Sequence, residues 1–84
     1  MSRSIASRAI IKALSASSSE DKKGLTKQEI CSYIAINIED PIIDIHFDPV
    51  TKEPYMPQFN YEMGRLITSR IVDRWGNRYR LRGF

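Results

Sequence analysis

The sequence predicts a small α+β domain of three helices followed by a two-stranded β-hairpin, with all 84 residues in a single domain, 1–84. Three observations lead to this fold class. Apolar residues recur at helical spacing in three segments, Thr26-Lys27-Gln28-Glu29 has the pattern of a helix capping box, and Gly76-Asn77 stands between two β-prone runs. A core this small argues against a deep catalytic pocket, so we expect a binding module and no enzyme.

Composition excludes several classes of protein. Hydrophobic residues make up 42% and charged residues 27% of the chain, as in folded globular domains. One cysteine and one histidine cannot provide an internal disulfide or a structural zinc site, so we expect no metal and no cofactor. Cys31 is expected in or near the core, and His46 on a solvated strand. The short apolar runs predict no membrane span and no signal peptide, which favours an intracellular protein of the cytoplasm, nucleoid or nucleus.

The first helix is predicted over residues 5–16, where apolar side chains recur at helical spacing. Ser2 or Ser4 is available as its N-cap. Residues 15–24 are serine-rich and charged, which is typical of an exposed loop.

The second helix has the clearest local signal. In a capping box the Thr26 hydroxyl accepts from the Glu29 amide, and the Glu29 carboxylate accepts from the Thr26 amide. We therefore expect a helix that begins at Lys27 and ends at Asn37 or at the Asp40-Pro41 pair.

Residues 39–59 interrupt the helical pattern. They hold all four prolines and five of the ten acidic residues, so no long helix can pass through them. Ile43, Ile45 and Phe47 alternate with polar residues, which suggests a short strand, and Asp48-Pro49 begins a turn. We expect an extended insertion between the second and third helices, for which an irregular hairpin is one form.

The third helix is predicted from Tyr61 to Ser69 or Arg70, with Asn60 as its N-cap. Gly64 is either a weak point of this helix or a place where another backbone comes close. The predicted inner face carries Met63, Leu66, Ile67 and then Ile71. The predicted outward positions are Tyr61, Glu62, Arg65, Thr68 and Ser69.

A Gly76-Asn77 turn pairs Trp75 with Arg78 and sets the register of the hairpin. Alternation then places on the core face Val72, Arg74, Tyr79 and Leu81, with Arg74 near the tip of the hairpin and its charged end extending to solvent. The outer face receives Asp73, Trp75, Arg78, Arg80 and Arg82. Trp75 beside Arg78 is expected to form a cation–π pair that stiffens the hairpin, or else to bind a partner. Because Asp73 lies opposite Arg80, we expect Arg80 to be the weaker phosphate ligand.

Basic charge is concentrated at the C-terminal end of the chain. Residues 65–84 contain six arginines and one aspartate, a net charge of +5, whereas residues 1–64 have a net charge of −2. The planar guanidinium of arginine suits phosphates and guanine edges, so this segment favours a nucleic-acid partner, although a solvated basic strand is the simpler explanation.

The order of helix, loop, capped helix, connection, third helix and arginine-bearing hairpin resembles the winged helix-turn-helix superfamily of DNA-binding domains. The most specific part runs from Met63 to Leu81, MGRLITSRIVDRWGNRYRL, which is similar to the third helix and wing of that superfamily. The segment Leu25 to Ile30 resembles the start of its second helix, and the spacing of these pieces is similar to that of the linker-histone globular domain. The resemblance implies a winged-helix fold with the third helix in the major groove.

The same resemblance implies a set of DNA contacts. Asn60, Tyr61 and Arg65 would face base edges, and Thr68 and Ser69 would bond to phosphates. The arginines of the hairpin would reach a flanking minor groove or the backbone. The full predicted DNA-binding set is Asn60, Tyr61, Arg65, Thr68, Ser69, Arg74, Trp75, Arg78, Arg80 and Arg82.

Two functions are compatible with these patterns. The first is binding of double-stranded DNA by a small transcriptional regulator or architectural protein, and either a phage or viral regulator or a domain of a longer protein would fit. The second is a docking module that binds a protein partner, or a second copy of itself, through segment 39–59. Tyr55, Met56 and Phe59 favour docking, because they are apolar and the neighbouring acids would repel DNA if they shared a face with the arginines.

Overall fold

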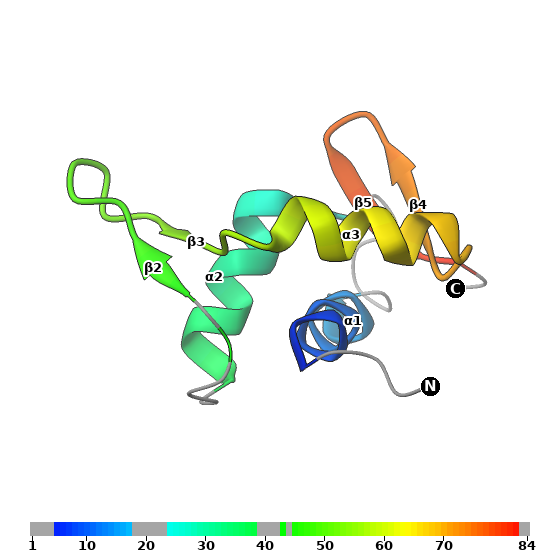
Figure 1. Ribbon diagram of the computed structural model, residues 1–84, viewed down its shortest axis with the longest axis horizontal. Coiled ribbons are helices and arrows are strands. Elements are labelled where there is room, and N and C mark those ends of the chain that lie inside the picture. The colour runs from blue at the N-terminus through cyan, green and yellow to red at the C-terminus, as the bar shows by residue number, and fades with distance from the viewer. Residues whose placement is uncertain (1–4, 18–23, 39–42, 44, 83–84) are drawn as a thin grey trace.

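The computed structural model describes residues 5–17, 24–38, 43 and 45–82. Its elements in chain order are α1 (Ile5–Ser17), β1 (Leu25–Thr26), α2 (Lys27–Asn37), β2 (His46–Phe47), β3 (Pro54–Tyr55), α3 (Phe59–Thr68), β4 (Val72–Trp75) and β5 (Arg78–Leu81) (Figure 1). These helices, the C-terminal hairpin and the insertion between α2 and α3 confirm the predicted fold, a small winged-helix-like α+β domain. The proposed N-caps of α1, Ser2 and Ser4, lie outside the described residues.

Helix α2 begins and ends where its local signals predict. The Glu29 amide donates to Thr26 Oγ1 at 3.2 Å, and the Thr26 amide donates to Glu29 Oε1 at 2.8 Å. Both halves of the capping box are therefore formed, and the first turn of α2 is fixed against the strand that precedes it.

Helix α3 begins earlier than predicted, at Phe59, and Asn60 is not its N-cap. Gln58 occupies the cap position without a side-chain hydrogen bond, and Asn60 lies exposed in the first turn. The reason is tertiary packing: the Phe59 ring is fully buried and meets the Tyr79 ring edge-on, with 5.8 Å between centroids. Burying this ring adds two residues, Phe59 and Asn60, to the start of the helix.

Glu62 was expected to point outward from α3, and this prediction is wrong. Its side chain is buried and accepts a hydrogen bond from the Ser7 hydroxyl of α1 at 2.5 Å. A polar pair thus joins α1 to α3 beside the apolar contacts, as a buried carboxylate requires a partner.

The wing, defined here as the β4–β5 hairpin, has the predicted register, with Trp75 opposite Arg78 and Val72 opposite Leu81. Gly76 has a φ of 62°, which a two-residue hairpin turn needs at its first central position. The sequence did not reveal that β1 pairs with the other edge of β5 and completes a three-stranded sheet in the order β1-β5-β4.

The insertion forms an irregular hairpin in which β2 and β3 pair, with His46 opposite Tyr55. Its turn is organised by Asp48, whose Oδ1 accepts from the amides of Val50 at 2.8 Å and Thr51 at 3.0 Å. These amide donors favour the ionised carboxylate and hold the pKa of Asp48 below its ordinary value.

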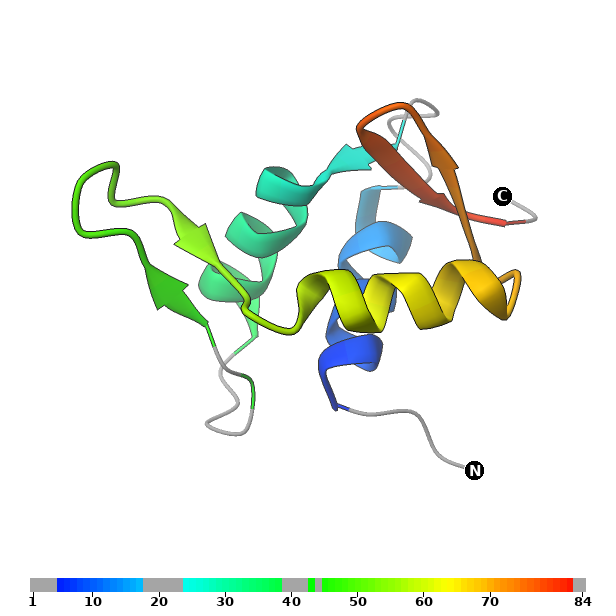
Figure 2. The same ribbon diagram turned by 45° about the horizontal axis from the view of Figure 1, so that its top comes forward.

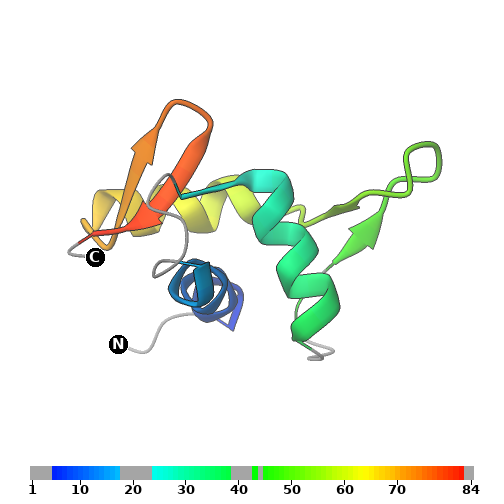
Figure 3. The same cartoon turned by 180° about the vertical axis from the view of Figure 1, so that it is seen from behind.

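The three helices and the wing share one hydrophobic core. Its largest fully buried side chains are Phe59, Ile10, Leu14, Ile30, Ile34, Met56, Val72 and Cys31. Burial raises the pKa of the Cys31 thiol, in keeping with the expected core position. In three views the β2–β3 hairpin extends beyond the N-terminal end of α3, and the wing lies near its C-terminal end (Figures 1, 2 and 3).

Candidate nucleic-acid interface

One side of α3 remains uncovered after the core has formed. Met63 and Leu66 are buried, and the side of the helix away from them carries an open hollow of about 490 Å³. The hollow, called the α3 face below, is lined by Asn60, Tyr61, Gly64, Arg65, Thr68 and Ser69. The four α3 residues of the predicted site and the C-cap residue Ser69 therefore lie together.

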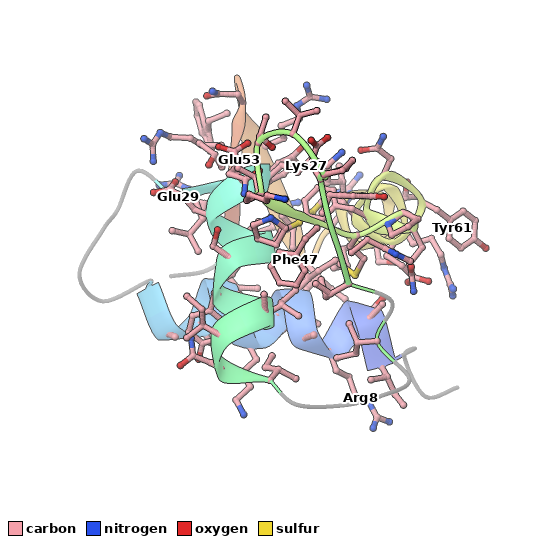
Figure 4. The ribbon with its side chains drawn as sticks, turned by 90° about the vertical axis from the view of Figure 1, so that its left-hand side faces the viewer. Arg8, Lys27, Glu29, Phe47, Glu53 and Tyr61 are labelled. Atoms are coloured by element: carbon pink, nitrogen blue, oxygen red, sulfur yellow. The ribbon has the colours of Figure 1, made fainter. Side chains whose placement is uncertain are left out.

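Tyr61 and Arg65 form the most prominent pair of the α3 face. The Tyr61 side chain is 66% exposed and points away from the body of the domain (Figure 4). The Arg65 guanidinium lies over its ring, 5.8 Å from the ring centroid. Such a contact uses the π-face of the ring and no N–H donor, so the donors of Arg65 remain available to a ligand.

Arg78 stands opposite Trp75 in the register of the wing, but its guanidinium does not form the predicted cation–π pair with the indole ring. Its Nη1 donates to the carbonyl oxygen of Gly24 at 2.8 Å and lies 3.5 Å from the Glu29 carboxylate. The cause is strand β1, which the sequence did not predict and which occupies the outer edge of β5. Arg78 therefore holds the wing against the start of α2, and this contact occupies one of its N–H donors.

Trp75 instead receives Arg80, whose guanidinium lies 5.2 Å from the centroid of the indole ring. The two residues are diagonal neighbours on the same face of the wing, where Asp73 stands opposite Arg80. Diagonal pairs are within reach of long side chains, so the predicted stiffening of the wing involves Arg80 and not Arg78.

Two other predicted arginines of the wing are accessible. Arg74 is exposed, lies over the Tyr79 ring at 6.0 Å, and donates from Nε to the Gly76 carbonyl oxygen at 2.9 Å. Arg82 has an exposed side chain, while its backbone amide is held by the Ile71 carbonyl oxygen at 2.9 Å. Both can reach a polyanion without losing the fold of the wing.

The predicted set omitted Arg70, which the structure places between the α3 face and the wing. Arg70 is exposed and follows the C-cap of α3 with a φ of 62°. The available signal was its place in the C-terminal segment 65–84, in which every basic residue is an arginine. The sequence alone did not show that the chain turns at Arg70.

Comparisons with protein-family models, with curated proteins and with solved structures give no match to this chain. The functional assignment therefore depends on the chemistry of the chain's own residues.

The acids of the β2–β3 hairpin are separated from the arginines of the wing by the length of α3. A helix of ten residues is about 15 Å long, which exceeds the screening length of about 8 Å at physiological salt. The acidic hairpin and the basic wing thus occupy opposite ends of the α3 face (Figure 1). The repulsion of DNA that a shared face would have caused is reduced.

Two further observations concern other classes of site. Within the described residues, no three His, Cys, Asp or Glu side chains gather where they could hold a metal ion, and His46 is exposed and stacks on Tyr55 with 5.6 Å between ring centroids. None of the described helices combines the length and apolar character needed to span a membrane.

Proposed function

We propose that this chain binds double-stranded DNA, as a transcriptional regulator or an architectural protein, with no catalytic step. In this proposal α3 enters the major groove and the wing contacts the backbone or the minor groove, as the resemblance to winged helix-turn-helix domains implies. The observation that carries the proposal is the α3 face, an uncovered helix surface with polar and cationic side chains next to an arginine-rich wing.

Each part of the α3 face has a matching group on DNA. Arg65 can donate two hydrogen bonds to O6 and N7 of guanine, and Asn60 can pair with N6 and N7 of adenine. The hydroxyl groups of Thr68 and Ser69 suit phosphate oxygens. Arg70, Arg74 and Arg82 add cationic contacts that carry no sequence information.

The decisive experiment first selects a preferred duplex from a random pool and then compares Arg65→Ala with wild type. We expect the variant to lose about 1 to 3 kcal/mol of binding free energy on the selected duplex and much less on random DNA. Its thermal midpoint should change little, because Arg65 is exposed.

Arg8→Ala is the matched control for this experiment. Arg8 is an exposed arginine of α1 and points away from Tyr61 (Figure 4). Arg8→Ala should leave the affinities for the selected duplex and for random DNA nearly unchanged. Equal losses on selected and random DNA for Arg65→Ala would reduce Arg65 to a phosphate contact, and a large loss of stability would show that its side chain supports the core.

A second candidate function is protein docking through the β2–β3 hairpin. The structure corrects the residues involved, because Met56 and Phe59 are buried in the core. The exposed apolar side chains of this segment are Phe47, Val50 and Tyr55, with exposures of 59%, 86% and 43%. A homodimer contact or a protein partner at this hairpin becomes the favoured proposal if the wild-type chain shows no duplex binding at 50 mM salt.

A further inference from the structure

Gly64 lies on the α3 face, and nothing in the described part of the chain requires glycine there. Gly64 does not have a positive φ, whereas Gly24 and Gly76 do. A Cβ added at Gly64 would meet no atom within 4 Å. Of the two interpretations that the sequence left open, close approach by another backbone of the described chain is therefore excluded.

Gly24 shows what an internal requirement looks like. A Cβ at Gly24 would lie 2.3 Å from the Tyr79 carbonyl oxygen, so the pairing of β1 with β5 explains that glycine. At position 64, glycine only destabilises the fold, because glycine in a helix interior lowers the folding equilibrium constant about two- to fivefold relative to alanine.

We propose that duplex DNA makes its closest contact with the α3 backbone at Gly64. This inference rests on the proposed function. Tyr61, Gly64 and Thr68 follow one another at helical spacing on the α3 face, so the missing side chain leaves a gap between two larger ones. A base edge or sugar at the wall of the major groove can rest on this gap while Tyr61 and Arg65 reach around it.

The test is a size series at this position, Gly64→Ala and Gly64→Leu, with Ala16→Leu as the control. Ala16 is an exposed residue of α1, so the control adds the same side chain to a helix surface outside the proposed contact. Folding is measured by chemical denaturation, and affinity by fluorescence anisotropy on the selected duplex.

We expect the two readouts to move in opposite directions. Gly64→Ala should raise the folding equilibrium about two- to fivefold, because alanine favours the helix and meets no atom. Affinity for DNA should fall by about fivefold to a hundredfold, with the larger loss for leucine, because added carbons overfill a close contact. A gain in stability together with a loss of affinity cannot arise from misfolding.

Two outcomes would overturn the proposal. If wild type binds duplex and both Gly64 variants bind it equally well, the close contact at Gly64 is wrong while the proposed function stands. If the wild-type chain binds no duplex, both proposals fail together.

Discussion

Under the proposed function, salt-dependent binding would separate the arginines that contact DNA from those that hold the wing. We consider Arg82→Gln and Arg78→Gln, each of which replaces a cation by a shorter, neutral side chain that remains polar. Arg82 is exposed, whereas Arg78 donates to the Gly24 carbonyl oxygen at 2.8 Å and lies 3.5 Å from Glu29. Only Arg82 is therefore expected to contact phosphate at full strength.

The expected magnitude follows from counterion release. Each phosphate contact contributes about −0.9 to the slope of log affinity against log salt, so a fourfold rise in salt weakens binding about 3.5-fold per contact. Arg82→Gln should flatten the slope by about 0.9 and leave stability unchanged. Arg78→Gln should flatten it by less than half as much and destabilise the fold by about 1 kcal/mol, because the hydrogen bond to Gly24 is lost.

Fluorescence anisotropy at 50, 100 and 200 mM salt measures the slope of log affinity against log salt, and thermal denaturation measures stability. Arg8→Gln on α1 serves as the control. The reasoning is refuted if Arg78→Gln flattens the slope as much as Arg82→Gln and leaves the thermal midpoint unchanged. That result would mean that Arg78 leaves Glu29 and faces DNA.

Two further predictions concern the local devices that hold the fold. Gly24→Ala should lower the free energy of unfolding by about 3 kcal/mol or more, measured by chemical denaturation. Alanine is strained at a φ of +84°, and its Cβ would lie 2.3 Å from the Tyr79 carbonyl oxygen. A loss below about 1 kcal/mol would contradict this close contact between Gly24 and β5. The second prediction concerns Asp48, whose pKa is lower in the folded state than in the unfolded chain. The stabilisation of the hairpin turn by the ionised Asp48 carboxylate is therefore complete above the unfolded pKa of about 4, and it is lost as pH falls through the folded pKa. The amide NMR signals of Val50 and Thr51 should therefore shift only below about pH 4. Asp48→Asn should abolish this shift. A transition above about pH 5 would contradict the prediction.

Local sequence signals predicted the elements that depend on neighbouring residues. The start of α2 follows from the capping box of Thr26 and Glu29, and the register of the wing follows from Gly76-Asn77. Strand β1 was missed because its two residues form a strand only by pairing with β5, more than fifty positions later in the chain. The start of α3 was misplaced for a similar reason, because the burial of Phe59 against Tyr79 is a long-range contact.

The α3 face was predictable because a helix that buries one side must expose the other, and the apolar period shows which side is buried. Glu62 was the exception, since its burial depends on Ser7, which comes from α1. The roles of Arg78 and Arg80 could not be separated by strand alternation, which places both on one side. The difference arises from β1 for Arg78 and from a diagonal contact with Trp75 for Arg80.

Under the proposed function, the same distinction sets how strongly DNA binding would depend on charge. Two of the six C-terminal arginines are half-buried as well as held by internal contacts, Arg78 at Gly24 and Arg80 on Trp75. The exposed members of the set are Arg65, Arg70, Arg74 and Arg82. If Arg65 contacts guanine, the three phosphate contacts of Arg70, Arg74 and Arg82 would weaken binding about 40-fold between 50 and 200 mM salt, whereas six would weaken it about 10³-fold. Arg78 and Arg80 thus keep the wing in position by contacts that do not involve DNA. Under the proposed function, Arg70, Arg74 and Arg82 can therefore be aligned with the α3 face before DNA arrives.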